Sequence, residues 1–171
     1  MKINKAFKFR IYPNQEQLKL INQTFGCVRF VYNHFLNQRN ELYKTEQKST
    51  TYVNQAKELT LLKQELIWLK EVDSVSLQSA LRNLDTAFKN FFSKRTKFPK
   101  FKSKKNEKQS FRLDGAISVE SDCIKLPRIG KLKLAEKDYI PTDCKILSAT
   151  VSKRAGKWFV SVQVETPDRE Y

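Results

Sequence analysis

The first strand of this chain is far in sequence from any strand that could pair with it, and this separation constrains the fold most. Residues 2–12 alternate in polarity, which is typical of a strand with one apolar face and one wet face. The next segments of period two follow only after Lys108. Because a lone strand is unstable in water, we expect it to pair with those later strands. Residues 13–107 are then an insertion.

The insertion has helical spacing, and we predict four helices in it. Pro13 ends the strand, Asn14 caps the first helix with Gln17 as its capping-box partner, and Gly26 ends that helix. The apolar stripes of the other three predict a helix from Val28 to Leu42, one over residues 52–69, and one that begins at Asp73 or Ser74 and ends before the FPKF turn.

The remainder of the chain reads as six short strands. They are QSFRL, AISVE, CIKL, KLKL, CKILSATVSKR and KWFVSVQVE. The last two flank Ala155 and Gly156, which predict a tight hairpin. We therefore predict an α+β fold, in which residues 1–12 and 108–171 form a small, OB-like antiparallel β-barrel. Residues 13–107 form its four-helix insertion.

Positive charge is concentrated in two segments. The chain has a net charge of +15, and residues 91–112 hold nine Lys or Arg and one acid, Glu107. Residues 1–12 add four cations and no acid. Clustered cations attract phosphates because each neutralised phosphate releases counterions, and the phenylalanines between these cations offer faces for base stacking. This pattern indicates nucleic-acid binding; the alternatives are a membrane surface and a solvated basic loop.

The cysteines and the single histidine do not predict a metal or cofactor site. The cysteines are far apart and form no CxxC pair, which disfavours a disulfide framework and a structural zinc site. We expect Cys27, Cys123 and Cys144 to be small buried apolar residues. His34 lies in a helical pattern, and we interpret it as a packed or surface residue.

Membrane and secretion signals are missing from the sequence pattern. No apolar run approaches the roughly 20 residues of a membrane helix, and the N-terminus lacks the apolar region of a signal peptide. We expect a cytoplasmic, nucleoid-associated protein without a membrane partner.

Several motifs along the chain resemble one family. They are AFKFRIYPNQEQ, FGCVRFVYNHFL, LTLLKQ, SLQSALRNLDTAFKNFF, KFPKFK, QSFRL, IKLPRIGKLKL and SKRAGKWFVSVQVE. Together, and in this order, they resemble the N-terminal half of TnpB, the OrfB-type protein of bacterial insertion sequences. The resemblance implies that the split barrel is a wedge domain and the helical insertion a recognition lobe. It also implies that the first helices correspond to a segment known in the family as a helix-turn-helix.

The resemblance also implies an activity for complete family members. They cleave double-stranded DNA beside a short transposon-adjacent motif, directed by a guide RNA. Cleavage requires a RuvC-like domain with three metal-binding carboxylates and a zinc ribbon. This chain ends at Tyr171, before the strand that carries the first catalytic Asp, and it has no cysteine quartet. We expect the family's magnesium and zinc sites to lie in the missing part, so that this chain holds no cofactor.

Acids near the C-terminus do not replace the missing carboxylates. Glu165, Asp168 and Glu170 cluster in one terminal segment. A two-metal nuclease site needs carboxylates that converge from separate, rigid elements. We therefore expect no catalytic residue and no enzymatic activity in this chain.

We expect two sets of binding residues, the first implied by the resemblance and the second by the clustered positive charge. Those expected to face the DNA motif are Asn4, Tyr52, Ser74, Gln78, Ser110, Phe111 and Arg112. Gln78 is chemically suited to adenine edges, although an exposed helix residue is the alternative, as a core-edge tyrosine is for Tyr52. The phosphate-contact candidates, which position without specifying, are Lys5, Lys8, Arg10, Lys94, Arg95, Lys97, Lys100, Lys102, Lys104, Lys105, Lys153, Arg154 and Lys157.

These observations lead to one functional hypothesis and two alternatives. We expect the chain to bind guide RNA and the double-stranded DNA that carries the adjacent motif, without cleaving it. The first alternative is that this sequence is a truncated form of an active RNA-guided DNA endonuclease. The second is a DNA-binding transcriptional repressor derived from one.

Overall fold

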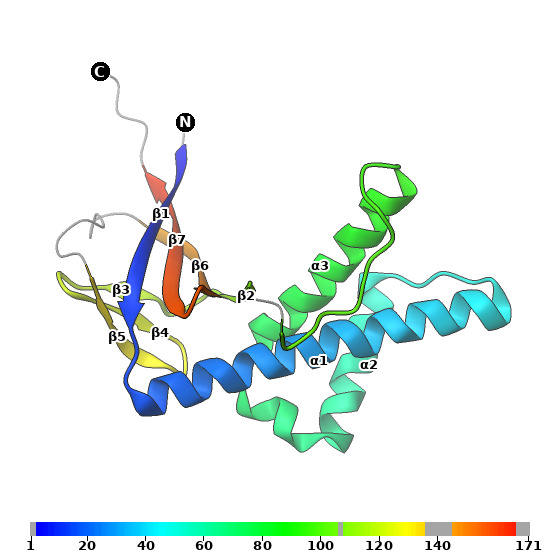
Figure 1. The fold of residues 1–171 in the computed structure, drawn as a ribbon, viewed down its shortest axis with the longest axis horizontal. Helices are drawn as coiled ribbons and strands as arrows, with labels where there is room; N and C mark the ends of the chain where they lie inside the picture. Colours follow the sequence, from blue (N-terminus) through cyan, green and yellow to red (C-terminus); the bar gives the residue numbers. More distant parts are fainter. Residues whose placement is uncertain (1–2, 106–107, 136–144, 167–171) are drawn as a thin grey trace. The chain divides into compact units, whose positions relative to one another are not determined.

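The computed structural model describes residues 3–105, 108–135 and 145–166 (Figure 1). The chain divides into two compact units. The sheet unit comprises residues 1–23 and 107–171, and the helical unit comprises residues 24–106.

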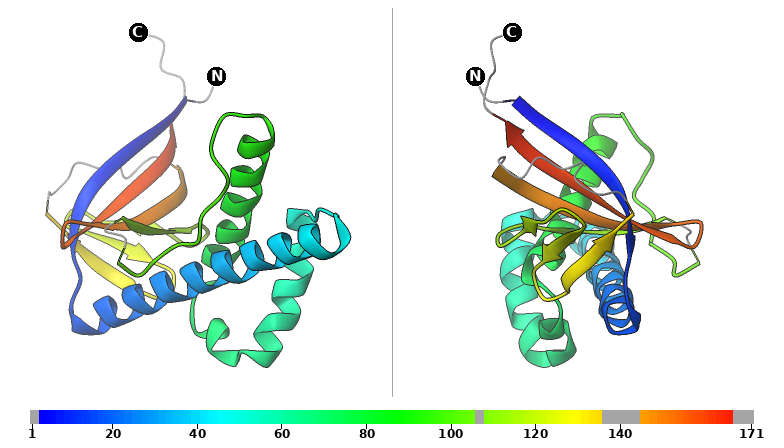
Figure 2. Two further views of the ribbon diagram at one scale, coloured as in Figure 1. Left: turned by 45° about the vertical axis from the view of Figure 1, so that its right-hand side comes forward. Right: turned by 90° about the vertical axis from the view of Figure 1, so that its left-hand side faces the viewer.

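One antiparallel sheet of seven strands forms the sheet unit, in the order β2-β6-β7-β1-β5-β4-β3. In this sheet β1 lies between β7 and β5, and Phe9 of β1 is opposite Val160 of β7. Figure 2 shows the long strands β1, β7 and β6 side by side. The prediction that the first strand joins the C-terminal strands is confirmed. The strands are β1 (Ile3–Tyr12), β2 (Gln109–Leu113), β3 (Ser118–Val119), β4 (Cys123–Leu126), β5 (Gly130–Leu134), β6 (Lys145–Arg154) and β7 (Lys157–Thr166).

The predicted closed barrel is wrong, because this sheet is open. Among the described residues no ladder joins the edge strands β2 and β3. The physical reason is length: β3 has two residues, which pair with β4 and cannot sustain a second ladder.

The hairpin between β6 and β7 forms as predicted. Ala155 and Gly156 have φ values of 52° and 73°, and a type I′ turn requires positive φ at both central residues. The turn places Arg154 opposite Lys157 and sets the register of both strands.

The apolar side chains of the sheet form the core of this unit. Val160, Val162 and Val164 alternate along β7 and are 0% exposed. Each fully buried side chain of this size contributes about 1.5–3 kcal/mol. Phe9 and Ile11 of β1 are also buried, so the alternation in the first strand correctly predicts its inward face.

The helical unit contains fewer helices than predicted. The described residues form α1 (Gln15–Glu46), α2 (Tyr52–Glu65), a short 3-10 helix (Ile67–Glu71) and α3 (Ser74–Phe92). The four-helix prediction is wrong because Gly26 does not end a helix: α1 continues through it. A glycine inside a helix costs about 1 kcal/mol, but the buried stripe passes it without a change of phase, from Phe25 to Val28 and Tyr32.

Helix caps agree with the sequence. The amide of Gln17 donates to Asn14 Oδ1 at 2.8 Å, and the amide of Asn14 donates to Gln17 Oε1 at 3.0 Å, which is the predicted capping box. Asp73 caps α3, since its carboxylate accepts from the Val75 amide at 2.9 Å.

A buried polar cluster joins the three helices of the helical unit. Arg39 of α1 donates from Nε to Gln55 of α2 at 2.9 Å and from Nη2 to Asp85 of α3 at 3.0 Å. Gln55 in turn donates to the carbonyl of Phe35 at 3.1 Å. Burial alone would raise the pKa of Asp85, but hydrogen bonds and charge from Arg39 and Lys89 outweigh burial and lower this pKa.

The cysteine expectations hold only in part. Cys27 is buried, as expected. Cys123 is only partly buried, because it lies at the exposed end of β4 with its thiol 3.3 Å from the Glu120 carboxylate. Cys144 lies outside the described residues. In the described ranges we find no helix with the length and apolar character needed to cross a membrane.

Candidate nucleic-acid interface

Strand register collects polar side chains from both ends of the chain on one face of the sheet. Residues that are directly opposite in an antiparallel sheet point to the same face. Across β2, β6, β7 and β1, two rows of such residues run side by side, and we call them the polar sheet face. The first row is Ser110, Ser152, Phe159 and Arg10. The second row is Arg112, Thr150, Ser161 and Lys8.

The polar sheet face combines cations, hydroxyls and an aromatic ring. The Lys8 ammonium lies 4.9 Å from the centre of the Phe159 ring. The Arg10 guanidinium lies 5.0 Å from the centre of the Tyr12 ring, which is itself 47% exposed. Such an arrangement offers charge to phosphates, hydroxyl groups to sugars and a ring to a base.

Other predicted residues of this unit have different positions. Asn4 is exposed on β1, opposite Glu165. Phe111 is 3% exposed, so its ring packs in the core of the sheet unit. Lys5 is exposed on β1, and Arg154 and Lys157 are exposed beside the hairpin turn. Lys153 places its ammonium 5.4 Å from the centre of the Trp158 ring.

The predicted motif-reading residues of the helical unit share one surface. Ser74 and Gln78 are exposed and one turn apart on α3, whereas Leu77, on the other side of the helix, is fully buried. Arg82 follows another turn later and stacks its guanidinium 5.0 Å from the centre of the Tyr52 ring. Arg82 thus links Tyr52 to the exposed side of α3. Sequence reasoning missed Arg82, although its i+4 spacing from Gln78 is a visible signal.

The basic segment after α3, residues 94–105, is held against the helices. Asn33 of α1 accepts from the Lys102 amide at 2.7 Å and donates to the Lys102 carbonyl at 2.8 Å. The Lys102 ammonium lies 4.3 Å from the centre of the Tyr32 ring, and partial burial of this ammonium lowers the pKa of Lys102. The segment is therefore more than a solvated loop. Its exposed cations include Lys94, Arg95, Lys97, Lys100, Lys104 and Lys105.

The start of the basic segment is fixed by the end of α3. Lys94 has a φ of 62°, and its amide donates to the carbonyl of Phe91. The Arg95 amide donates to the carbonyl of Asn90 at 2.9 Å. These two bonds form a Schellman cap, a position that favours glycine because of its left-handed backbone. Here the chain places a lysine in that position, next to an arginine.

In the described ranges, one group of three residues with metal-ligand chemistry and a single histidine are candidates for a metal or catalytic site. His34 is a surface residue that stacks on Phe30 with ring centres 5.6 Å apart. Glu120, Asp122 and Cys123 have ligand atoms within 4.8 Å of one another, on an exposed turn. Burial and the nearby Glu120 raise the pKa of Cys123, which favours the thiol over the thiolate that binds metals. Asp168 and Glu170 lie outside the described residues.

The sheet and its basic surfaces define an α+β protein suited to a polyanionic partner, and known proteins narrow this class. A helix-turn-helix domain family of the OrfB IS605 type matches residues 1–48. In this structure the matched segment is β1 followed by α1, which continues as one helix.

Three relatives match a larger part of the chain. A putative RNA-guided DNA endonuclease of Streptomyces pristinaespiralis is 40% identical over 168 residues, which cover 95% of this chain and 42% of that protein. The putative RNA-guided DNA endonuclease InsQ of Escherichia coli K12 is 35% identical over 170 residues, covering 97% and 42%. Virulence protein VsdF of Salmonella dublin is 39% identical over 111 residues, covering 58% and 93%.

The chain belongs to the TnpB, or OrfB-type, family. It spans 42% of the length of each of the two relatives named as endonucleases. Family membership supports nucleic-acid binding by a TnpB-related protein.

Proposed function

We propose that this chain binds a guide RNA and the motif-bearing DNA duplex, and that it does not cleave DNA by itself. The observation that carries the proposal is the polar sheet face. Its two rows contain four residues that we expect to contact nucleic acid: Lys8, Arg10, Ser110 and Arg112. The first two are about a hundred residues away in sequence from the last two.

The two units have different chemistry, which supports different roles. Cations and hydroxyls on the sheet suit the sugar–phosphate backbone and the 2′-hydroxyls of RNA. Gln78 and Arg82 on α3 carry amide and guanidinium groups, which pair with adenine and guanine edges in a major groove. We assign backbone holding to the sheet unit and motif reading to the surface of Ser74, Gln78, Arg82 and Tyr52.

The names of two relatives favour a second candidate. Both are called putative RNA-guided DNA endonucleases. If the chain is part of a longer protein that carries a nuclease domain, the same surfaces would position DNA for cleavage. A repressor that occupies the motif would need the motif-reading surface alone. Sequencing the gene downstream of Tyr171 and testing repression by the 171-residue protein separate these candidates.

The test of the proposal has two steps. RNA that copurifies with the 171-residue protein is sequenced, and the preferred duplex is selected from a randomised library in its presence. Gln78→Ala should then weaken binding to the preferred duplex by about 1–3 kcal/mol and to scrambled duplexes much less. Lys100→Ala should weaken both equally. Asn83→Ala, exposed elsewhere on α3, is the matched control.

Equal losses on both duplexes for Gln78→Ala would remove it from motif reading. Failure to recover any specific RNA, together with weak binding to every duplex, would refute the proposed function as a whole.

A further inference from the structure

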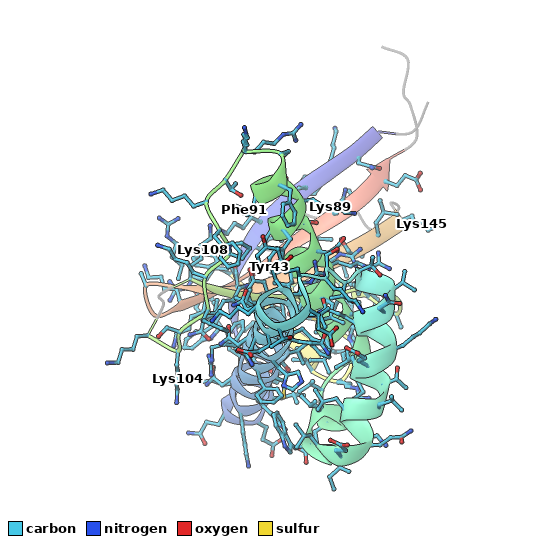
Figure 3. All side chains as sticks on the ribbon, turned by 90° about the vertical axis from the view of Figure 1, so that its right-hand side faces the viewer. Tyr43, Lys89, Phe91, Lys104, Lys108 and Lys145 are labelled. Atoms are coloured by element: carbon cyan, nitrogen blue, oxygen red, sulfur yellow. The ribbon has the colours of Figure 1, made fainter. Side chains whose placement is uncertain are left out.

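The helical unit contains an open pocket that is not used by the polar sheet face or by the motif-reading surface of α3. Its volume is about 560 Å³, within the range of roughly 300–1,000 Å³ typical of small-ligand sites. It lies between the C-terminal halves of α1 and α3, the loop of residues 48–51 and Phe98. Figure 3 labels Tyr43, Lys89 and Phe91, three of the residues that line it.

The walls of this pocket are aromatic and partly uncovered. Tyr43 on α1 is 66% exposed, and Phe92 on α3 is 67% exposed. Phe98 meets the rings of Phe88 and Phe91 edge-on, with centres 5.5 and 5.1 Å apart. These contacts fix the Phe98 ring at the wall of the pocket. Flat rings at a pocket wall favour an aromatic guest.

The charges around the pocket favour an anionic guest. Lys44, Lys48 and Lys89 contribute cations, and Asp85 is the single acid in the lining. Asp85 is already compensated, since Arg39 and Lys89 each lie 3.0 Å from its carboxylate. Lys48 has only a loose, exposed contact of 3.7 Å with Glu46. The basic segment begins directly beyond the pocket at Lys94 and adds further positive charge.

A nucleotide is both aromatic and anionic, so it fits both features of this pocket. We infer that this pocket receives an unpaired base of a single-stranded nucleic acid, with its flanking phosphates on Lys44 and Lys48. The base stacks on the exposed aromatic rings, and Asn40, Ser49 and Thr50 offer amide and hydroxyl groups to its edge. This inference rests on the proposed nucleic-acid binding and adds a site to it.

Two strands with equal charge test the inference on the 171-residue protein. One is a thymidine homopolymer of roughly 12 nucleotides, within the site sizes of single-strand binders. The other has the same phosphates but abasic sugars. Fluorescence anisotropy should give tighter binding to the strand with bases. Tyr43→Ala should remove about 5- to 150-fold of affinity for that strand and leave binding to the abasic strand unchanged.

Two further variants separate stacking from folding. Tyr43→Trp keeps a stacking surface and should retain the preference for bases. Leu61→Ala, at an equally exposed site of α2 outside the pocket, should change neither affinity. If Tyr43→Ala and Phe92→Ala leave the preference for bases unchanged, or if the wild type shows no such preference, the pocket has another occupant, such as a protein segment. If the wild type binds neither strand, this result would instead refute the proposed function.

Discussion

Arg39→Met should destabilise the helical unit by about 3 kcal/mol. Arg39 is 9% exposed and is the donor that joins α1 to Gln55 and to Asp85. A hydrogen bond to a charged partner contributes about 1.5–3 kcal/mol, and leaving the buried Gln55 oxygen without this donor costs about 1–3 kcal/mol. Methionine preserves most of the buried aliphatic volume, which limits the added cavity cost.

The assay is urea unfolding followed by the helical circular dichroism signal. Lys89→Ala is the control because it removes the other cation beside Asp85, but from a side chain that is 77% exposed. An exposed i,i+4 pair contributes only about 0.3–0.5 kcal/mol. A loss below about 1 kcal/mol for Arg39→Met, or equal losses for both variants, would refute the assignment of Arg39 as the residue that joins the helices.

The wild type and Arg39→Met should also differ in how their free energy of unfolding depends on pH. The pKa of Asp85 is lowered in the folded state, so its contribution to stability is complete above its unfolded pKa of about 3.9. That contribution is lost as pH falls through the lower, folded pKa. Arg39→Met has a smaller Asp85 contribution to lose. The difference in unfolding free energy between the wild type and Arg39→Met should therefore stay constant from pH 7 to 5 and narrow below about pH 4.

Three other predictions follow from the fold and the basic surfaces. If about six phosphates are engaged, the logarithm of affinity should fall with the logarithm of salt with a slope near −4 to −5, and a slope shallower than about −1 would contradict the binding surface. A protein of residues 13–171 lacks β1, which leaves β7 and β5 without their shared neighbour, and should lose cooperative unfolding of its sheet; native-like β signal would contradict this. With magnesium and a guide, the 171-residue protein should leave target DNA uncut, and guide-dependent cutting that Asp168→Asn abolishes would show the opposite.

Local rules predicted what neighbouring residues decide. The capping box at Asn14, the Asp73 cap and the Ala155–Gly156 hairpin each depend on residues within a few positions, and all three form. The end of the first helix also seemed a local matter, because Gly26 is a typical helix terminator. The prediction that Gly26 ends this helix was wrong. Phe25 and Val28, on either side of Gly26, are 4% and 7% exposed, and burial of a continuous stripe outweighs the cost of one glycine.

Barrel closure failed for a different reason. Closure depends on whether both edge strands are long enough to pair, and strand length is poorly marked in the sequence. AISVE alternates over five residues, yet only Ser118 and Val119 form strand. The sequence pattern reports the polarity of a segment, and it does not report how many of its amides find a partner across the sheet.

The polar sheet face could be predicted from the sequence only in part. Because Phe9 and Ile11 must enter the core with Val160 and Val162, Lys8 and Arg10 are forced onto the face that carries Phe159 and Ser161. Polarity alone therefore predicts which face is basic. It does not predict which residues are opposite one another, since no turn joins β1 to β7 and a slip of two residues would preserve the same faces. Only the register brings the N-terminal cations into rows with the hydroxyls of β6 and with Ser110 and Arg112 of β2. A binding surface made in this way depends on sheet pairing as much as on its own side chains, so removing β1 should abolish it even though six of its eight residues remain.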